Sequence, residues 1–407
     1  MNNTYESTLL DQPTPFHTRI EGDEYTVVPL GTFRRQTILT PWKETMKIRL
    51  RLALVGLAIS FALPIFAQQT NTSDTDKVRF KFQDITNAND PTFNQELGIN
   101  NAGVIAGYFG SGAAGHPNKG YTVVRPYKTQ LDFTNENFPG SVQTQVTGIN
   151  NRDELRFDRD RGEFGFDRDR DRGGWDSDRN RGEFGFDRVF RGTTVGFWSD
   201  MNNANLVNNN FGFVNIGGQY GRFINVNNPN TGTINGVKIN QLLGVNDRNI
   251  AVGFYVDTAG ATHGYTYGIA TNTFSANIDD PNGVGATTAA AINDHDQIVG
   301  FYTDGNGVTH GFFESGGVFK TIDAANATAT SLLGLNNFGE AVGFDIDTNG
   351  AMHGIICDVV TGACEQQDDP NGIGTTTFNG LNDRGQIVGF YVNGAGNTIG
   401  LLTTPVR

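Results

Sequence analysis

The clearest structural signal in this 407-residue chain is the stretch Gly380-Leu381-Asn382-Asp383-Arg384-Gly385-Gln386-Ile387-Val388-Gly389-Phe390-Tyr391. An apolar residue precedes an asparagine, a glycine follows three positions later, and an apolar run is centred on a second glycine. Similar stretches occur at five other places. The asparagines of the six copies, here called the anchor asparagines, are Asn100, Asn150, Asn246, Asn293, Asn336 and Asn382. Self-similarity at an interval of about 45 residues is the signature of a repeat architecture.

Each copy predicts a hairpin turn followed by a strand. The third residue after the anchor is always glycine, asparagine or aspartate, the types that tolerate a positive φ, as in Gly385 and Asn249. A glycine inside a strand normally weakens it, so its recurrence in six strands predicts close approach of another backbone. These glycines are Gly107, Gly196, Gly253, Gly300, Gly343 and Gly389. A second glycine-centred strand follows, as at Gly311-Phe312.

With two further short strands, each repeat has the content of a propeller blade. The last repeat ends without its final strand, and the segment Arg79–Ile85 resembles that strand, as a comparison with Phe319–Asp323 shows. An N-terminal strand that completes the last blade would hide the open edges of the stack. We therefore predict an all-β fold: a six-bladed β-propeller of four-stranded antiparallel blades, closed by an N-terminal strand. A different blade count and an open stack are the alternatives.

The repeat pattern resembles that of the HAF-repeat extracellular proteins of bacteria. The resemblance rests on Gly380–Tyr391 and on the unit His310-Gly311-Phe312, and it covers nearly all of residues 80–407. The chain departs from the pattern at Asn202–Ile239 and at the insertion described below. The resemblance implies secretion and a repeat fold, and it implies no established activity.

The N-terminal region contains a predicted signal peptide at residues 46–67. Met46 opens a basic stretch, an apolar run follows at 52–66, and Ala67 is a small residue before Gln68. The apolar run is short for a membrane span, which favours a cleaved signal over a signal-anchor helix. Residues 1–45 are then an over-extended gene start or a disordered arm. We expect residues 68–407 to form one propeller domain, secreted to the extracellular space or the periplasm, with no stable membrane span after cleavage.

Residues 152–191 form a low-complexity insertion in the second repeat. The sequence Arg-Gly-Glu-Phe-Gly-Phe-Asp-Arg occurs in it twice, and acidic and basic residues are interleaved throughout. The segment has no periodicity that would bury one face, so a mobile loop is expected. The alternative is an adhesive arm that uses aromatic and cation–π contacts. Its candidate contact residues are Phe164, Phe166, Trp175, Phe184 and Phe186.

Two patterns suggest metal binding weakly. His263, His310 and His353 share one repeat position, and histidine is a common metal ligand, but a structural role in a hairpin is favoured. The stretch that contains Asp345, Asp347 and Asn349 opens like a calcium loop, yet an EF-hand would need a glutamate where Ile356 stands. We expect turns stabilised by aspartate side chains, with calcium as the lesser alternative and no other cofactor.

The two cysteines are predicted to form a disulfide. Counted from the repeat histidine, Cys357 and Cys364 occupy the places of Tyr267 and Phe274, which should face each other across a hairpin. A cross-strand disulfide suits an exported protein. A redox-active pair is the alternative.

Motifs for catalysis are lacking: no serine elbow, zinc-protease helix motif or phosphate-binding loop occurs. We expect a non-enzymatic binding protein or scaffold whose ligand is a surface polysaccharide or another protein. The alternatives are a channel-centred hydrolase or lyase, with or without assistance from a metal ion, and a structural envelope protein that self-associates through residues 152–191. The net charge of −13 argues against a nucleic-acid partner. The sequence makes no prediction of the oligomeric state.

Overall fold

The structure, a computed structural model, describes residues 79–113, 115–152, 192–201, 208–218, 221–283 and 285–406. The predicted signal peptide at 46–67, residues 1–45 and the arm candidates Phe164, Phe166, Trp175, Phe184 and Phe186 lie outside these residues. The described part contains strands, one 3₁₀ turn, η1 (Gln130–Asp132), and no α-helix. None of its helical segments has the length and hydropathy that a membrane span requires.

The strands form six antiparallel four-stranded sheets, as predicted. Blade 1 contains β2 (Asn94–Ile99), β3 (Ile105–Phe109), β4 (Lys119–Val123) and β5 (Phe133–Asn135). Blade 2 contains β6 (Gln143–Ile149), β7 (Thr193–Ser199), β8 (Phe211–Ile216) and β9 (Arg222–Val226). Blade 3 contains β10 (Asn240–Val245), β11 (Ile250–Val256), β12 (Thr262–Gly268) and β13 (Thr273–Phe274).

The remaining three blades repeat this order. Blade 4 contains β14 (Thr287–Ile292), β15 (Ile298–Thr303), β16 (Thr309–Ser315) and β17 (Val318–Ile322). Blade 5 contains β18 (Ala329–Leu335), β19 (Glu340–Ile346), β20 (Met352–Asp358) and β21 (Cys364–Gln366). Blade 6 contains β22 (Thr377–Leu381), β23 (Ile387–Val392), β24 (Thr398–Val406) and β1 (Arg79–Ile85).

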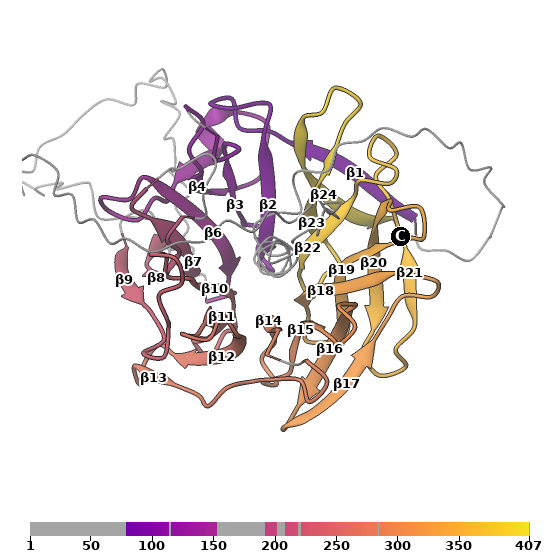
Figure 1. Ribbon diagram of the computed structural model, residues 1–407. Helices are drawn as coiled ribbons and strands as arrows, with labels where there is room; N and C mark the ends of the chain where they lie inside the picture. Colours follow the sequence, from indigo (N-terminus) through magenta and orange to yellow (C-terminus); the bar gives the residue numbers. More distant parts are fainter. Residues whose placement is uncertain are drawn as a thin grey trace, which may run out of the picture. The chain divides into compact units, whose positions relative to one another are not determined.

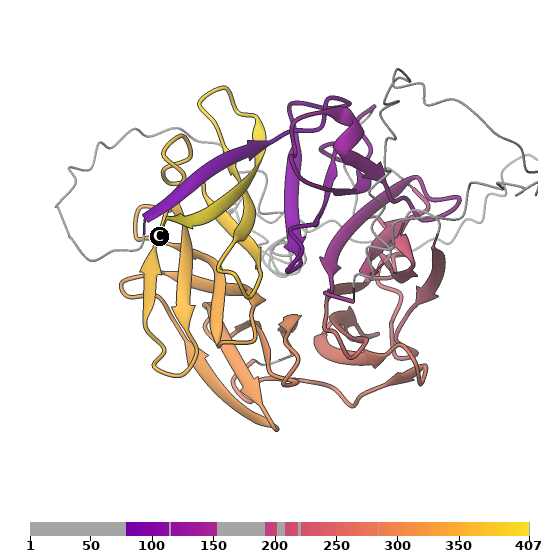
Figure 2. The ribbon, with the colours of Figure 1, turned by 180° about the vertical axis from the view of Figure 1, so that it is seen from behind.

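The ring is closed by β1, which confirms the prediction from the two ends of the repeat array. β1 pairs antiparallel with β24 along its whole length, from Arg79 opposite Val406 to Ile85 opposite Gly400. Figures 1 and 2 show the blades arranged around a centre, with the indigo β1 beside the yellow β24. The first segment and the last segment of the propeller therefore belong to one sheet.

The turns after the anchor asparagines have the predicted conformation. Gly103, Asn249, Asp296, Gly339 and Gly385 all have a positive φ between 59° and 82°. The sixth equivalent, Asp153, lies outside the described residues. The anchor side chain stabilises the turn because its Oδ1 accepts two backbone N–H groups; in blade 3, Asn246 accepts from Arg248 at 3.1 Å and from Ile250 at 3.0 Å.

The strand glycines mark a close approach of two backbones, as predicted. In every blade one residue of the first strand is bulged out, as between Leu332 and Gly334. The bulge moves a carbonyl group against the second strand, so a methyl group on Gly343 would overlap the carbonyl oxygen of Ser331. The other five glycines face the equivalent carbonyl oxygens. Only glycine fits this position in each blade.

The second set of glycines lets neighbouring blades pack together. A Cβ at Gly311 of blade 4 would lie 3.0 Å from the Leu332 side chain of blade 5. Leu332 is fully buried. The apolar core therefore lies between adjacent sheets: one cluster joins Val195 and Val214 of blade 2 to Leu242 of blade 3.

Candidate functional site

The anchor asparagines surround the centre of the ring and connect consecutive blades. The amide nitrogen of Asn246 donates to the backbone carbonyl of Asn293 at 3.0 Å, and that of Asn382 donates to Asn100 at 3.0 Å. The anchors of blades 1, 2 and 4 make the same bond to the next blade. Asn336 makes only the bond within its own hairpin, where its amide donates to Glu340 at 2.7 Å; Asn293 and Asn382 make an equivalent bond in addition to the one to the next blade.

The residues that follow the anchors form a second, complete circle, here called the polar belt. Its members are Asn101, Asn151, Asp247, Asp294, Asn337 and Asp383. The backbone N–H of each member donates to the side-chain oxygen of the next, at 2.5 to 2.9 Å, and the last bond runs from Asp383 back to Asn101. Sequence analysis did not predict this belt. Its signal was present, since the residue after every anchor is asparagine or aspartate.

The polar belt lines a central cavity of about 70 Å³. An apolar ring formed by Ile99, Ile149, Val245, Ile292, Leu335 and Leu381 lines the cavity together with the belt and anchors. Burial raises the pKa of Asp247, and the neighbouring Asp294 carboxylate raises it further. Small-molecule sites usually occupy about 300–1,000 Å³. The described cavity lies below this range.

A second candidate site recurs in blades 3, 4 and 5, where each repeat histidine lies between two aspartates. We call these the Asp-His-Asp units: Asp257, His263 and Asp279; Asp304, His310 and Asp323; Asp347, His353 and Asp368. Nδ1 of each histidine is 2.7 or 2.8 Å from the aspartate that follows the outer strand. Nε2 is 3.4 to 3.8 Å from the aspartate of the hairpin before the histidine strand. Blades 1, 2 and 6 carry Lys119, Phe211 and Ile399 at the histidine position.

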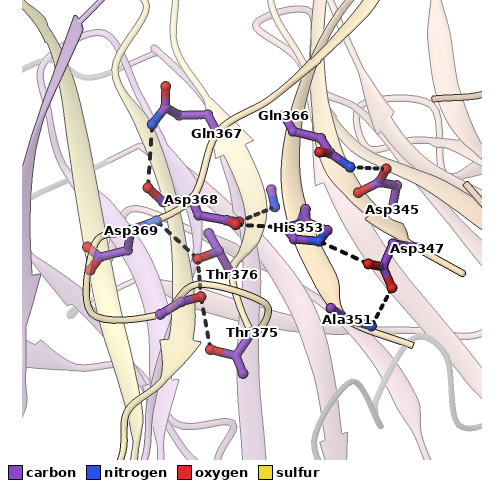
Figure 3. A network of polar contacts seen from close by, with 12 residues as sticks. Asp345, Asp347, Ala351, His353, Gln366, Gln367, Asp368, Asp369, Thr375 and Thr376 are labelled. Atoms are coloured by element: carbon purple, nitrogen blue, oxygen red, sulfur yellow. Dashed lines mark hydrogen bonds and ion pairs between the residues drawn. The ribbon is translucent and has the colours of Figure 1, made fainter. Parts of the chain in front are cut away.

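The histidines are also held by a neighbour on the second strand. The rings of Tyr255 and His263 lie 5.3 Å apart, and those of Tyr302 and His310 lie 5.2 Å apart. In blade 5 the tyrosine is replaced by Asp345, which pairs with His353 in the strand register and accepts a hydrogen bond from Gln366 (Figure 3). The imidazole is therefore fixed on several sides, while the exposed fraction of its carboxylate partners ranges from 16% for Asp368 to 40% for Asp323.

In the blade 5 unit, three carboxylates act on the histidine. The hydrogen bond to Asp368 raises the pKa of His353, against the effect of burial, and the charges of Asp368, Asp345 and Asp347 raise it further. Burial raises the pKa of Asp345 itself. Figure 3 shows His353 between Asp368 and Asp347. A positive imidazole is thus stabilised here by the surrounding carboxylates.

The structure separates the three histidine candidates, whereas Asp345, Asp347 and Asn349 lie in blade 5 with His353. His263, His310 and His353 lie on three different blades, each bound to its own aspartates. Asp347 forms the expected turn, because its Oδ1 accepts the N–H groups of Asn349 and Ala351, each at 2.8 Å. Over the residues that the structure describes, no group of three His, Cys, Asp or Glu side chains is placed to hold a metal ion.

The predicted disulfide is present between Cys357 and Cys364. The two residues are directly opposite each other on β20 and β21, in the register that Tyr267 and Phe274 have in blade 3. The alignment of repeats within the chain therefore located the pair correctly.

Among proteins of known structure, several resemble this chain, each at low sequence identity. No protein-family model matches the chain, and no curated protein matches it. AofleA from Arthrobotrys oligospora has 11% identity and a TM-score of 0.44, with 80% of this chain and 86% of that chain covered. A mutant of the Aleuria aurantia lectin in complex with Fucalpha1-6GlcNAc has 9% identity and a TM-score of 0.39, with 76% and 91% covered. A Trypanosoma rangeli sialidase has 8% identity and a TM-score of 0.40, with 79% and 56% covered. At these values the similarities carry no functional argument.

Proposed function

We propose that this protein is an exported, non-enzymatic propeller that binds a neutral surface polysaccharide through its three Asp-His-Asp units. The observation that carries the proposal is the repetition of one preorganised polar unit on three consecutive blades. Export rests on the signal-like segment 46–67 and on the resemblance to HAF-repeat extracellular proteins. N-terminal sequencing of exported protein, with a first residue at Gln68, would test that part.

The chemistry of the units suits a ligand rich in hydroxyl groups. Asp279 and Asp323 leave 37% and 40% of their side chains exposed, so a ligand can reach them. An ionised carboxylate only accepts hydrogen bonds, and hydroxyl groups are the donors that match it. The histidine holds the carboxylate in one orientation, which lowers the ordering cost of binding.

Repetition and charge narrow the class of ligand further. Three similar units on one scaffold favour a repetitive ligand, because the second and third contacts form at high effective concentration. The chain carries a net charge of −13, which repels a polyanion. A neutral polysaccharide satisfies both conditions.

Binding of the full chain to a panel of neutral and acidic polysaccharides tests the proposal. The variants Asp279→Asn, Asp323→Asn and Asp368→Asn preserve side-chain shape and remove one charge each. We expect each single variant to weaken binding a few-fold and the triple variant to weaken it more than tenfold. Asp358→Asn, on an exposed hairpin of blade 5, is the matched control and should bind like the wild type. Wild-type affinity in the triple variant, or no binding to any neutral polysaccharide, would refute the proposal.

A further inference from the structure

One position at the seams between blades is occupied by a different kind of residue in blade 1. It precedes the bulge of the first strand, and it is fully buried in all six blades. In five blades the residue is apolar: Val146, Leu242, Ala289, Leu332 and Phe378. In blade 1 it is Glu96. A glutamate therefore takes the place of a core residue.

The carboxyl group of Glu96 is only partly satisfied. Its Oε1 accepts a hydrogen bond from the hydroxyl of Tyr121 at 2.6 Å, and its Oε2 has no hydrogen-bond partner. The group lies between two glycines: a Cβ at Gly107 would be 2.7 Å from Oε2, and one at Gly400 would be 2.6 Å from Oε1. Any side chain at either glycine would collide with the carboxyl group.

This seam is the one that closes the ring. Gly107 lies on β3 of blade 1, whereas Gly400 lies on β24 of blade 6. Gly400 pairs with Ile85 of β1, and a Cβ at Gly400 would also be 2.7 Å from the Ile85 carbonyl oxygen. Glu96 is therefore packed against the sheet that the closing strand completes.

The surroundings give no cation to compensate a charge on Glu96. From β4 and the segment after it, the titratable groups that face it are Tyr121 and Tyr127, whereas Tyr108 of β3 donates its hydrogen bond to Gln95. From blade 6, the facing residues Gly400 and Ile85 are uncharged. Burial raises the pKa of Glu96 to about 8, although the Tyr121 hydrogen bond acts in the opposite direction. The protonated form is thus the form that fits the closed seam.

We propose that Glu96 makes closure of the propeller ring pH-dependent: the seam between blades 1 and 6 is tight while the carboxyl group is protonated, and it opens more readily as pH rises. The direction follows from proton linkage. When the seam opens, water reaches the carboxyl group and its pKa returns to about 4.5. Between that value and about 8 the closed state binds more protons than the open state. The opening equilibrium then rises by up to about tenfold per pH unit in this window and levels off above it.

Hydrogen exchange of the full chain tests this proposal, with Glu96→Gln as the isosteric variant that cannot ionise. The readout is the ratio of wild-type to variant exchange rates, which cancels the intrinsic pH dependence of exchange. We expect the ratio for β1 and β24 amides to rise by at least tenfold between pH 5 and pH 8 and then to stay constant. Amides of β15 and β16 in blade 4 should show a ratio near one throughout.

A second variant keeps the test decisive if Glu96→Gln does not fold. Glu96→Leu copies the residue of blades 3 and 5, and it should protect β1 more strongly than the wild type at pH 8. A ratio for β1 that does not change with pH would overturn the proposal. Equal changes in blade 4 would also overturn it, because they would show general loosening rather than opening of one seam.

Discussion

Replacing Asn246 by alanine should destabilise the propeller by about 2–4 kcal/mol. The buried side chain accepts the N–H groups of Arg248 and Ile250 and donates to the carbonyl of Asn293 in the next blade. Alanine leaves three backbone groups without this partner. Each such loss costs about 1–3 kcal/mol when water cannot replace the partner, and the exposed turn allows some replacement. Three such losses would sum to about 3–9 kcal/mol, and water that replaces part of the lost partner at the turn lowers the expected total to about 2–4 kcal/mol.

The assay is urea unfolding of the full chain followed by circular dichroism, at constant m-value. Two controls separate the contributions. In the wild type, Asn336 bonds Glu340 of its own hairpin instead of the next blade. Asn336→Ala should therefore lower the free energy of unfolding by about 1 kcal/mol less than Asn246→Ala does. Asn306→Ala removes a contact within an exposed hairpin and should change stability by less than about 0.5 kcal/mol. If Asn246→Ala were no more destabilising than Asn306→Ala, the anchor asparagines would not connect the blades as described.

Three further predictions follow from the blade geometry. Gly343→Ala should destabilise the protein by about 1–3 kcal/mol in the same urea assay, because its methyl group meets the Ser331 carbonyl. Gly305→Ala, with open space around it, should be nearly neutral. Equal effects of the two variants would contradict the close approach of the two backbones at Gly343. The pKa of His353 is raised in the folded state, so the stabilising contribution of its positive charge is complete below about pH 6.5 and is lost as pH rises through the folded-state pKa. The difference in unfolding free energy between wild type and His353→Asn should therefore shrink from pH 6 to pH 9. A difference that grows over this range would show that the carboxylates do not stabilise the charged imidazole. Removing the disulfide with Cys357→Ser and Cys364→Ser should cost about 2–3 kcal/mol in thermal unfolding, since the bridge closes a short loop; an unchanged Tm would show that the hairpin alone fixes this turn.

Much of the fold was predictable because the same local sequence pattern, with the same backbone requirements, recurs in each repeat. Positive φ after the anchor, glycine at the close approach and the missing strand of the last repeat are all local properties of the sequence. The disulfide was predictable for a related reason: residues at equivalent repeat positions have equivalent neighbours, so the pairing of Tyr267 with Phe274 also holds for Cys357 and Cys364.

The candidate sites were harder to predict because their partners are distant along the chain. The histidines were recognised as one repeat position, but the aspartates that hold them, such as Asp279, lie on other segments of the blade. The polar belt depends on bonds between different blades, and one of them joins Asp383 to Asn101. No local pattern indicates which polar atoms will face each other across such separations.

The sequence by itself determined the number of blades, the position of the turns and the strand that closes the ring, because periodicity and backbone sterics act within short segments. Only the tertiary structure decided which side chains meet at the centre and at the seams, because those neighbours are set by how whole blades pack together. Glu96 illustrates the difference. A glutamate in a sequence predicts an exposed, charged side chain, but the packing of β24 and β1 against Glu96 buries its carboxyl group.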